Sequence, residues 1–186
     1  MQNLYLFNEE NKEYSMSIPY EDGAEIPSNG TLEVPPETEE NETLIYNDGW
    51  EIVKDYRFTH KMCKTEGNKY VIENIEELGE IPEGWELITN EVAEERAERN
   101  RINSLNMTKY DFYKYVCIPN EITYATLINL VNSDENIAAA WNLCERVYRG
   151  DADLITTVKK YIPVITDEIL DALFIEHGKE PTAVEI

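Results

Sequence analysis

The side chains that could transfer protons, attack a substrate or bind a metal are few. The chain has the histidines His60 and His177 and three widely separated cysteines, Cys63, Cys117 and Cys144. Structural zinc sites use clustered cysteines and histidines, and no cysteine here has a Cys-x-x-Cys partner. His60 and Cys63 are three residues apart in a predicted strand, so their side chains point to opposite faces. The sequence therefore predicts no metal site and no cofactor.

Carboxylate pairs and phosphate-binding loops do not predict an enzyme either. Asp151 and Asp153 could offer carboxylates to a cation, but they follow a glycine and precede an apolar run, so we interpret them as a helix N-terminus. The pair Glu76-Glu77 is of a kind that arises by chance in so acidic a chain. The eight glycines are single and fall at predicted turns, and no serine lies in a nucleophile-elbow context. We expect no catalytic residues.

Charge is informative about partners. The chain carries 38 acidic and 16 basic side chains, a formal net charge of −22, and residues 1–50 contain 12 acids with Lys12 as their one base. Such a chain repels nucleic acid and anionic membranes, so we expect direct binding to neither. Three interpretations stay open: a solubilising surface, attraction to a basic protein surface, and imitation of nucleic acid.

Composition and cysteine usage favour a soluble protein made in a cytosol. Hydrophobic residues make up 42% of the chain, too many for a wholly disordered protein. No apolar run approaches the roughly 18 residues that a membrane span needs. The N-terminus has neither a basic region nor a long apolar core, so no signal peptide is predicted. An odd number of distant cysteines suits reduced thiols.

The elements that must position any site begin with strands and loops. Residues 1–18 hold two strand-forming runs, NLYLF and EYSMSI, around the polar NEENK, and predict an N-terminal hairpin. Residues 19–42 are rich in proline, glycine and glutamate, and we interpret them as an acidic, irregular linker that orders against a partner.

Residues 43–88 predict a small antiparallel β unit. Asp48-Gly49 suits a two-residue turn between strands at 44–47 and 50–55. Two further strands, at 58–63 and 69–73, would complete a meander.

The second half has helical patterning. Residues 89–106 predict a charged connecting helix, capped by Thr89 or Asn90, with so little apolar surface that it serves as a solvated spacer or, alternatively, as a seam for self-association. Residues 107–180 predict a compact domain of short helices, and 181–186 form a tail. The expected fold class is therefore α+β.

Five helices are predicted in that domain. They start after Thr108, at Pro119, after Ser133, at Asp153 and after Thr166, each at a capping or helix-opening residue. The third is expected to continue to Gly150, because Ile137, Ala140, Trp141, Cys144, Val147 and Tyr148 fall on one helical stripe.

Aromatic residues give the predicted contact surface. The β unit has many rings and few aliphatic residues, and so small a sheet cannot cover all of them. Trp, Tyr and Arg dominate interface energies. For Arg57 the alternative is an ion pair with Asp55 or Asp48 at the rim of the hairpin. The predicted partner-binding residues are Trp50, Tyr56, Arg57, Phe58 and Trp85.

The order of these pieces resembles a known family. A W-x-x-V-x-D-x-R pattern is made by Trp50, Val53, Asp55 and Arg57, and a G-x-x-P-x-G turn by Gly79, Pro82 and Gly84. With the charged helix that follows, residues 27–105 resemble the tail-fibre-assembly-like accessory proteins of tailed bacteriophages. The segment beginning LNMTKYDF is similar to a helical C-terminal unit of related phage tail-module proteins, with matching residues Met107, Thr108, Asp111, Phe112, Tyr148, Arg149 and Gly150.

The resemblance implies a chaperone or attachment role and no catalytic residues. The partner would be a tail fibre or receptor-binding protein, met in the host bacterial cytoplasm during assembly or in the virion tail, and the helical domain would dock or form a homo-oligomer. The alternative is an acidic phage-encoded inhibitor that mimics nucleic acid and occupies a basic host defence effector.

Overall fold

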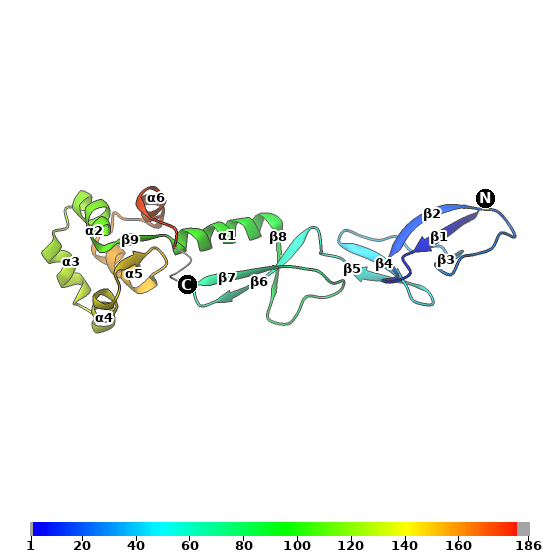
Figure 1. The fold of residues 1–186 in the computed structure, drawn as a ribbon, viewed down its shortest axis with the longest axis horizontal. Coiled ribbons are helices and arrows are strands. Elements are labelled where there is room, and N and C mark those ends of the chain that lie inside the picture. The colour runs from blue at the N-terminus through cyan, green and yellow to red at the C-terminus, as the bar shows by residue number, and fades with distance from the viewer. Residues whose placement is uncertain (1, 182–186) are drawn as a thin grey trace. The chain divides into compact units, whose positions relative to one another are not determined.

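A computed structural model describes residues 2–181, and it has strands in its N-terminal half and helices in its C-terminal half (Figure 1). The predicted α+β class is confirmed. The chain divides into two compact units: a β unit, comprising residues up to Glu66 with Val71–Ala93, and a helical unit, comprising Gly67–Tyr70 with residues from Glu94 on. The predicted tail at 181–186 lies outside the described residues except for Pro181.

The first sheet of the β unit has the order β2-β1-β3. Strands β1 (Gln2–Phe7) and β2 (Tyr14–Tyr20) form the predicted N-terminal hairpin. The prediction that residues 19–42 are irregular throughout is wrong at both ends and in the middle. Pro19 and Tyr20 belong to β2 and Glu42 starts the fourth strand, while β3 (Gly30–Thr31) pairs antiparallel with β1. A Cβ at Gly30 would lie 3.1–3.2 Å from side-chain atoms of neighbouring residues, so only glycine fits this close approach without a shift.

The second sheet is the hairpin of β4 (Glu42–Tyr46) and β5 (Trp50–Lys54). Its turn has three residues and not the predicted two, because Tyr46 pairs with Trp50. The Asn47 N–H donates to the Gly49 carbonyl at 3.0 Å, and Asp48 has a left-handed φ of +54°.

A third sheet with the order β7-β6-β8 stands where the sequence predicted the rest of one meander. It consists of β6 (His60–Glu66), β7 (Lys69–Asn74) and the unpredicted β8 (Glu86–Thr89). The meander is broken because Tyr56–Thr59 form a turn: the N–H of His60 donates to the Tyr56 carbonyl at 3.0 Å. Phe58, predicted to start a strand, lies in this turn.

The N-terminal hairpin packs on the second sheet. Glu13 pairs with Ile45 in an isolated bridge, and the Tyr46 N–H donates to the Lys12 carbonyl at 3.0 Å. Rings from both hairpins meet in a cluster, with centroids of neighbouring rings 4.8–6.4 Å apart. The members of this ring cluster are Phe7, Tyr14, Tyr46 and Trp50.

Apart from the start of β7, the described part of the helical unit contains helices and one short strand pair. Its elements are the C-terminal part of α1 (Asn90–Ser104), β9 (Asn106–Thr108), α2 (Lys109–Phe112), the π-helical turn η1 (Tyr113–Cys117), the 3-10 turn η2 (Ile118–Asn120), α3 (Tyr124–Val131), α4 (Glu135–Leu143), β10 (Arg146–Tyr148), α5 (Ala152–Tyr161) and α6 (Asp167–His177). Thr108 and Thr166 cap α2 and α6 as predicted, each accepting a backbone hydrogen bond three residues on.

The predicted helix from Ser133 to Gly150 is wrong in its second half. The helix observed in this region is α4, which is capped by Asp134. It ends at Leu143 because Cys144 takes an extended conformation. Val147 is buried in β10, opposite Met107 of β9.

Pro119 does not open the α-helix predicted there, but lies in the first turn of a 3-10 helix, η2. Helix α3 starts later, after Thr123, whose hydroxyl accepts from the Thr126 N–H. In contrast, α5 begins one residue earlier than predicted, at Ala152 rather than Asp153, with Asp151 as its cap.

The connecting helix α1 is more than the solvated spacer predicted for 89–106. In the helical unit, Ile102 is buried, and Arg99 donates two hydrogen bonds to Asp171 of α6 at 3.1 and 2.6 Å. The thin apolar stripe misled the prediction because this helix is held partly by ion pairs.

Candidate partner-binding site

The turn that follows β5 is fixed by an arginine with two carboxylates. Arg57 Nε and Nη2 donate to the two oxygens of Asp55, and Nη1 and Nη2 donate to the two oxygens of Glu13, each at 2.9 Å. All three side chains are between 17% and 21% exposed. We call this group the Arg57 clip. It joins the N-terminal hairpin to the segment after β5.

The hydrogen bonds of the clip favour the charged forms of Asp55 and Arg57. The hydrogen bonds from Arg57 lower the pKa of Asp55, and the bonds to Asp55 and Glu13 raise the pKa of Arg57. Four of the five guanidinium N–H groups have acceptors inside the β unit. The ion pair with Asp55, left open as an alternative by the sequence, is present, and Arg57 is occupied structurally rather than free for a partner.

Phe58, the next residue, is directed to the surface. Its side chain is 81% exposed, with the guanidinium carbon of Arg57 5.7 Å from the ring centroid. The Phe58 carbonyl accepts from Asn90 Nδ2 at 3.2 Å, and the hydroxyl of Thr59 donates to Asn41 at 2.6 Å. A large apolar ring is thus presented on a backbone held from several sides, which reduces the entropy lost when it is buried.

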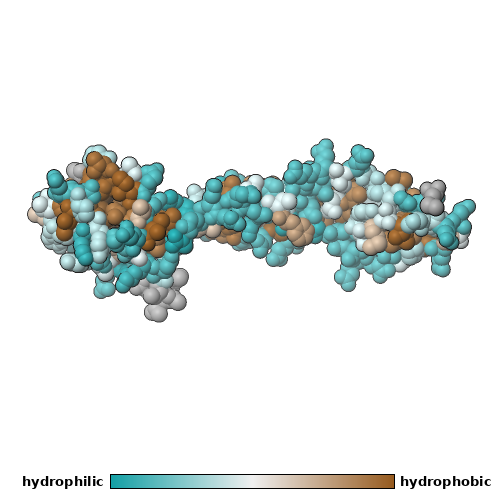
Figure 2. Space-filling model, turned by 90° about the horizontal axis from the view of Figure 1, so that it is seen from above, coloured by the Kyte–Doolittle hydropathy of each residue, from teal (hydrophilic) through white to brown (hydrophobic). Residues whose placement is uncertain are grey.

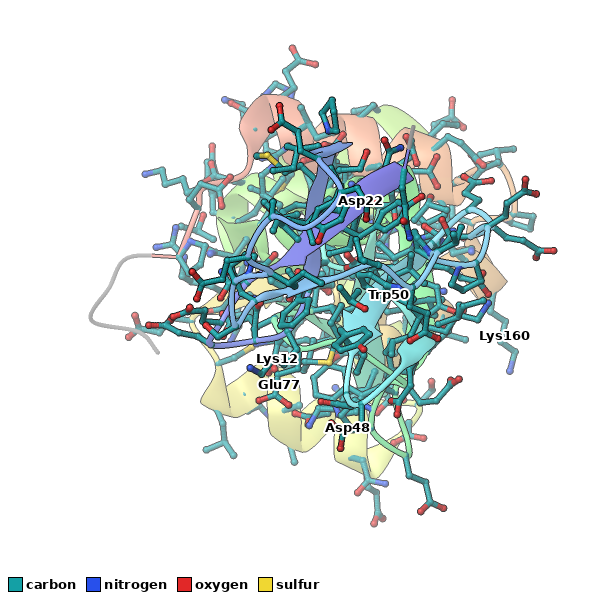
Figure 3. The ribbon with its side chains drawn as sticks, turned by 90° about the vertical axis from the view of Figure 1, so that its right-hand side faces the viewer. Lys12, Asp22, Asp48, Trp50, Glu77 and Lys160 are labelled. Atoms are coloured by element: carbon teal, nitrogen blue, oxygen red, sulfur yellow. The ribbon has the colours of Figure 1, made fainter. Side chains whose placement is uncertain are left out.

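The other predicted contact residues have neighbours of their own. Trp50, labelled in Figure 3, belongs to the ring cluster, and its Nε1 donates to the Glu33 carbonyl at 2.8 Å. Half-buried Tyr56 lies edge-on to His60 with centroids 5.4 Å apart. The Lys64 ammonium lies 4.7 Å from the Trp85 ring centroid. Of the five predicted residues, Phe58 is the one with a largely free surface.

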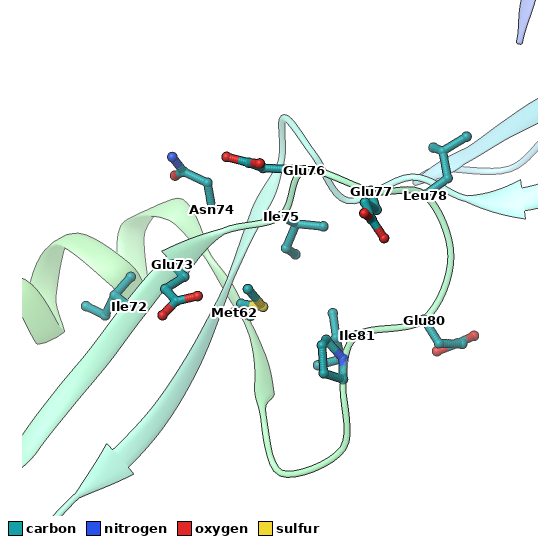
Figure 4. A pocket seen from close by; sticks show the side chains of 11 residues that line it. Met62, Ile72, Glu73, Asn74, Ile75, Glu76, Glu77, Leu78, Glu80 and Ile81 are labelled. Atoms are coloured by element: carbon teal, nitrogen blue, oxygen red, sulfur yellow. The ribbon is translucent and has the colours of Figure 1, made fainter. Parts of the chain in front are cut away.

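Sequence reasoning missed a groove beside the third sheet. It encloses about 670 Å³ on the β unit, and the segment from Asn74 to Pro82 curves around it (Figure 4). Apolar side chains and four glutamates line it together. A signal was present, because an apolar residue recurs at every third position. These residues are Ile72, Ile75, Leu78 and Ile81.

The groups with reactive potential lie elsewhere or are buried. Burial raises the pKa of Cys117 to about 12, which keeps this thiol protonated near neutral pH. His177 stacks on Tyr115 with centroids 3.8 Å apart. Within residues 2–181 no three His, Cys, Asp or Glu side chains gather closely enough to hold a metal ion. None of the helices described in that range has the length and apolar character to span a membrane.

Hydrophobic side chains reach the surface in separate patches between hydrophilic ones (Figure 2). Phe58 is among the most exposed of the large apolar residues, together with Leu143 at 86% and Val34 at 72%. Comparisons of the chain with models of protein families, with curated proteins and with solved structures give no match.

Proposed function

We propose that this chain is a non-catalytic accessory protein of bacteriophage tails, which binds a tail fibre or receptor-binding protein as an assembly chaperone or attachment factor. The observation that carries the binding role is Phe58, 81% exposed on a turn fixed by the Arg57 clip. The motif resemblance at Trp50, Asp55 and Arg57 supports the choice of partner. The protein would act in the host cytoplasm during assembly or in the finished tail.

The contact would work by burial of a pre-positioned ring. Aromatic anchors at the centre of an interface dominate binding energy, and most surrounding contacts contribute little. The carboxylates of Asp55 and Glu13 hold Arg57, and the turn backbone is bonded to Asn90 and Tyr56. Phe58 therefore needs little ordering when it enters a pocket of the partner.

The test is co-expression with the products of the neighbouring genes, followed by pull-down and titration. Phe58→Ala is expected to weaken the complex by about 30-fold, the loss of a hot-spot side chain. Leu143→Ala is the matched control, since it removes a similarly exposed apolar side chain from the helical unit. Unchanged affinity in the Phe58 variant would remove the basis of the proposal.

The acidic surface gives a second candidate, an inhibitor that mimics nucleic acid and occupies a basic host effector. The net charge of −22 and the glutamates around the groove favour it. Such a complex would dissociate at about 0.5 M salt, where charge interactions are screened over a few ångströms. A complex centred on Phe58 would persist, so the salt titration separates the two candidates.

A further inference from the structure

The groove of the β unit is lined by apolar side chains and by four exposed glutamates, which we take as its rim. Met62 of β6 lies near its centre, and Ile75 and Ile81 project toward the enclosed space (Figure 4). Ile75 is 8% exposed and the other two are half-buried, so an apolar surface stays accessible there. We call this feature the acidic groove. Its rim residues are Glu73, Glu76, Glu77 and Glu80.

Three of the four rim carboxylates have no partner among the described residues, whereas Glu73 lies close enough to Lys64 to help raise the pKa of that lysine. All four glutamates are exposed, and Glu76, Glu77 and Glu80 form no hydrogen bond or ion pair with any other residue in the described range 2–181. The nearby cations are engaged: Lys61 donates to Asn74 at 3.1 Å and Lys64 pairs with Glu66 at 2.7 Å. In a chain of net charge −22 this leaves a strongly negative potential beside an apolar surface.

We propose that the acidic groove binds a basic amphipathic segment of a protein partner. Aliphatic side chains of the segment would cover Met62, Ile75 and Ile81, and its lysines or arginines would pair with the rim glutamates. The volume of about 670 Å³ lies in the range of small ligand sites and holds a few side chains.

The arrangement favours an extended cation over a single ion. Across residues 2–181 no cluster of three carboxylates converges as a metal site would require, so the rim charges are spread along the segment from Glu73 to Glu80. Lysine and arginine suit such a rim, because their alkyl stems cover apolar surface while their charges stay at the edge. Neither a bare ion nor a purely apolar ligand would use both parts of the groove.

The acidic groove is separate from the predicted contact turn. Its lining does not include Phe58, Arg57 or Tyr56. This inference therefore goes beyond the proposed function, and each can fail without the other.

The experiment measures fluorescence anisotropy of a labelled peptide of alternating leucine and lysine, with a leucine–glutamate peptide of equal length as its counterpart. The intact protein is expected to bind the basic peptide and not the acidic one. Binding of the basic peptide is expected to weaken about tenfold or more in the triple variant Glu76→Lys, Glu77→Lys and Glu80→Lys, where attraction becomes repulsion.

A second triple variant separates the groove from the overall charge. Glu10→Lys, Glu21→Lys and Glu40→Lys change the net charge equally at exposed positions outside the groove lining, and this variant should keep most of the affinity. Phe58→Ala should bind the peptide as the intact protein does. If the lysine rim variant loses the tryptophan fluorescence of the folded protein, to which Trp50 and Trp85 of the β unit contribute, the glutamine triple at the same positions takes its place.

Three results would overturn the proposal. One is equal binding of the acidic peptide, and another is equal weakening in both triple variants. The third is displacement of the peptide by spermidine at matched charge concentration, which would identify a small polyamine as the ligand.

Discussion

The β unit and the helical unit are stabilised in different ways. The helical unit has a continuous core in which Phe112, Leu170 and Phe174 are fully buried. In the β unit the buried apolar residues are spread over three small sheets, and the ring cluster and the Arg57 clip join its parts. Burial of apolar surface dominates one unit and directional contacts dominate the other.

This difference bears on where function lies. A domain with a large core tolerates substitutions on its surface. Small sheets have too little area to bury all their aromatic side chains, so rings and grooves stay exposed to solvent. Phe58 and the acidic groove both belong to the β unit. Variants that remove one kind of contact from one unit test whether the two units are stabilised differently.

The largest expected effect is in the helical core. Phe112→Ala should lower the free energy of unfolding of the helical unit by about 3–5 kcal/mol, because it removes a fully buried ring that packs on Trp141 and Phe174. Urea unfolding followed by the circular dichroism of the helices measures it. Tyr110→Ala, at a ring 71% exposed, is the control and should change stability little. A loss below about 1 kcal/mol for Phe112→Ala would contradict the core assignment.

The next effect concerns ion pairs in the same unit. Arg149 is 7% exposed in its side chain, with Nε 2.7 Å from Asp171 Oδ1, a distance that makes an ion pair although its angle makes no hydrogen bond. Asp171→Ala leaves this charge without one partner and also releases Arg99, so it should cost about 3 kcal/mol. The same unfolding experiment measures it. Glu180→Ala, at an exposed pair with Arg101, should have little effect, and equal losses would show that burial is irrelevant.

Local chemistry made much of this fold predictable. Capping by Thr108 and Thr166 depends on residues within three positions, and the N-terminal hairpin on a short alternation of residue types. The fold class follows from such local signals. The exposed ring at Phe58 was predicted as a contact residue on composition alone.

Pairings between distant segments were missed for a physical reason. Val147 continues a helical stripe in sequence but is placed in a strand by its pairing with Met107, 40 positions earlier. Gly30 joins a sheet because β1 approaches it closely. Likewise Arg57 reaches Glu13, which no local pattern indicates. The groove needed the curvature of the segment after β7, which the three-residue recurrence of isoleucine and leucine does not specify.

The smallest predicted effect is a pH dependence in the β unit. The folded-state pKa of Asp55 is lowered by Arg57, so its contribution to stability is fully present above the unfolded pKa of about 3.9 and is lost as pH falls through the lower folded value. Asp55→Asn should cost about 1 kcal/mol at neutral pH and nothing at the acid end of the titration. Unfolding followed by tryptophan fluorescence, to which Trp50 and Trp85 of the β unit contribute alongside Trp141, measures the intact protein and the variant.

The difference in free energy of unfolding between the intact protein and the Asp55→Asn variant isolates the contribution of Asp55 from that of the other charged groups. Protonation of many carboxylates in a chain of net charge −22 also relieves repulsion, so the stability of either protein alone can move in either direction as pH falls. The effect of protonating the other carboxylates is common to the intact protein and the variant. It therefore cancels when one free energy of unfolding is subtracted from the other. A difference that stays constant from neutral pH to below about pH 3 would mean that Arg57 does not favour the charged form of Asp55, and the directional account of the β unit would then fail at its central contact.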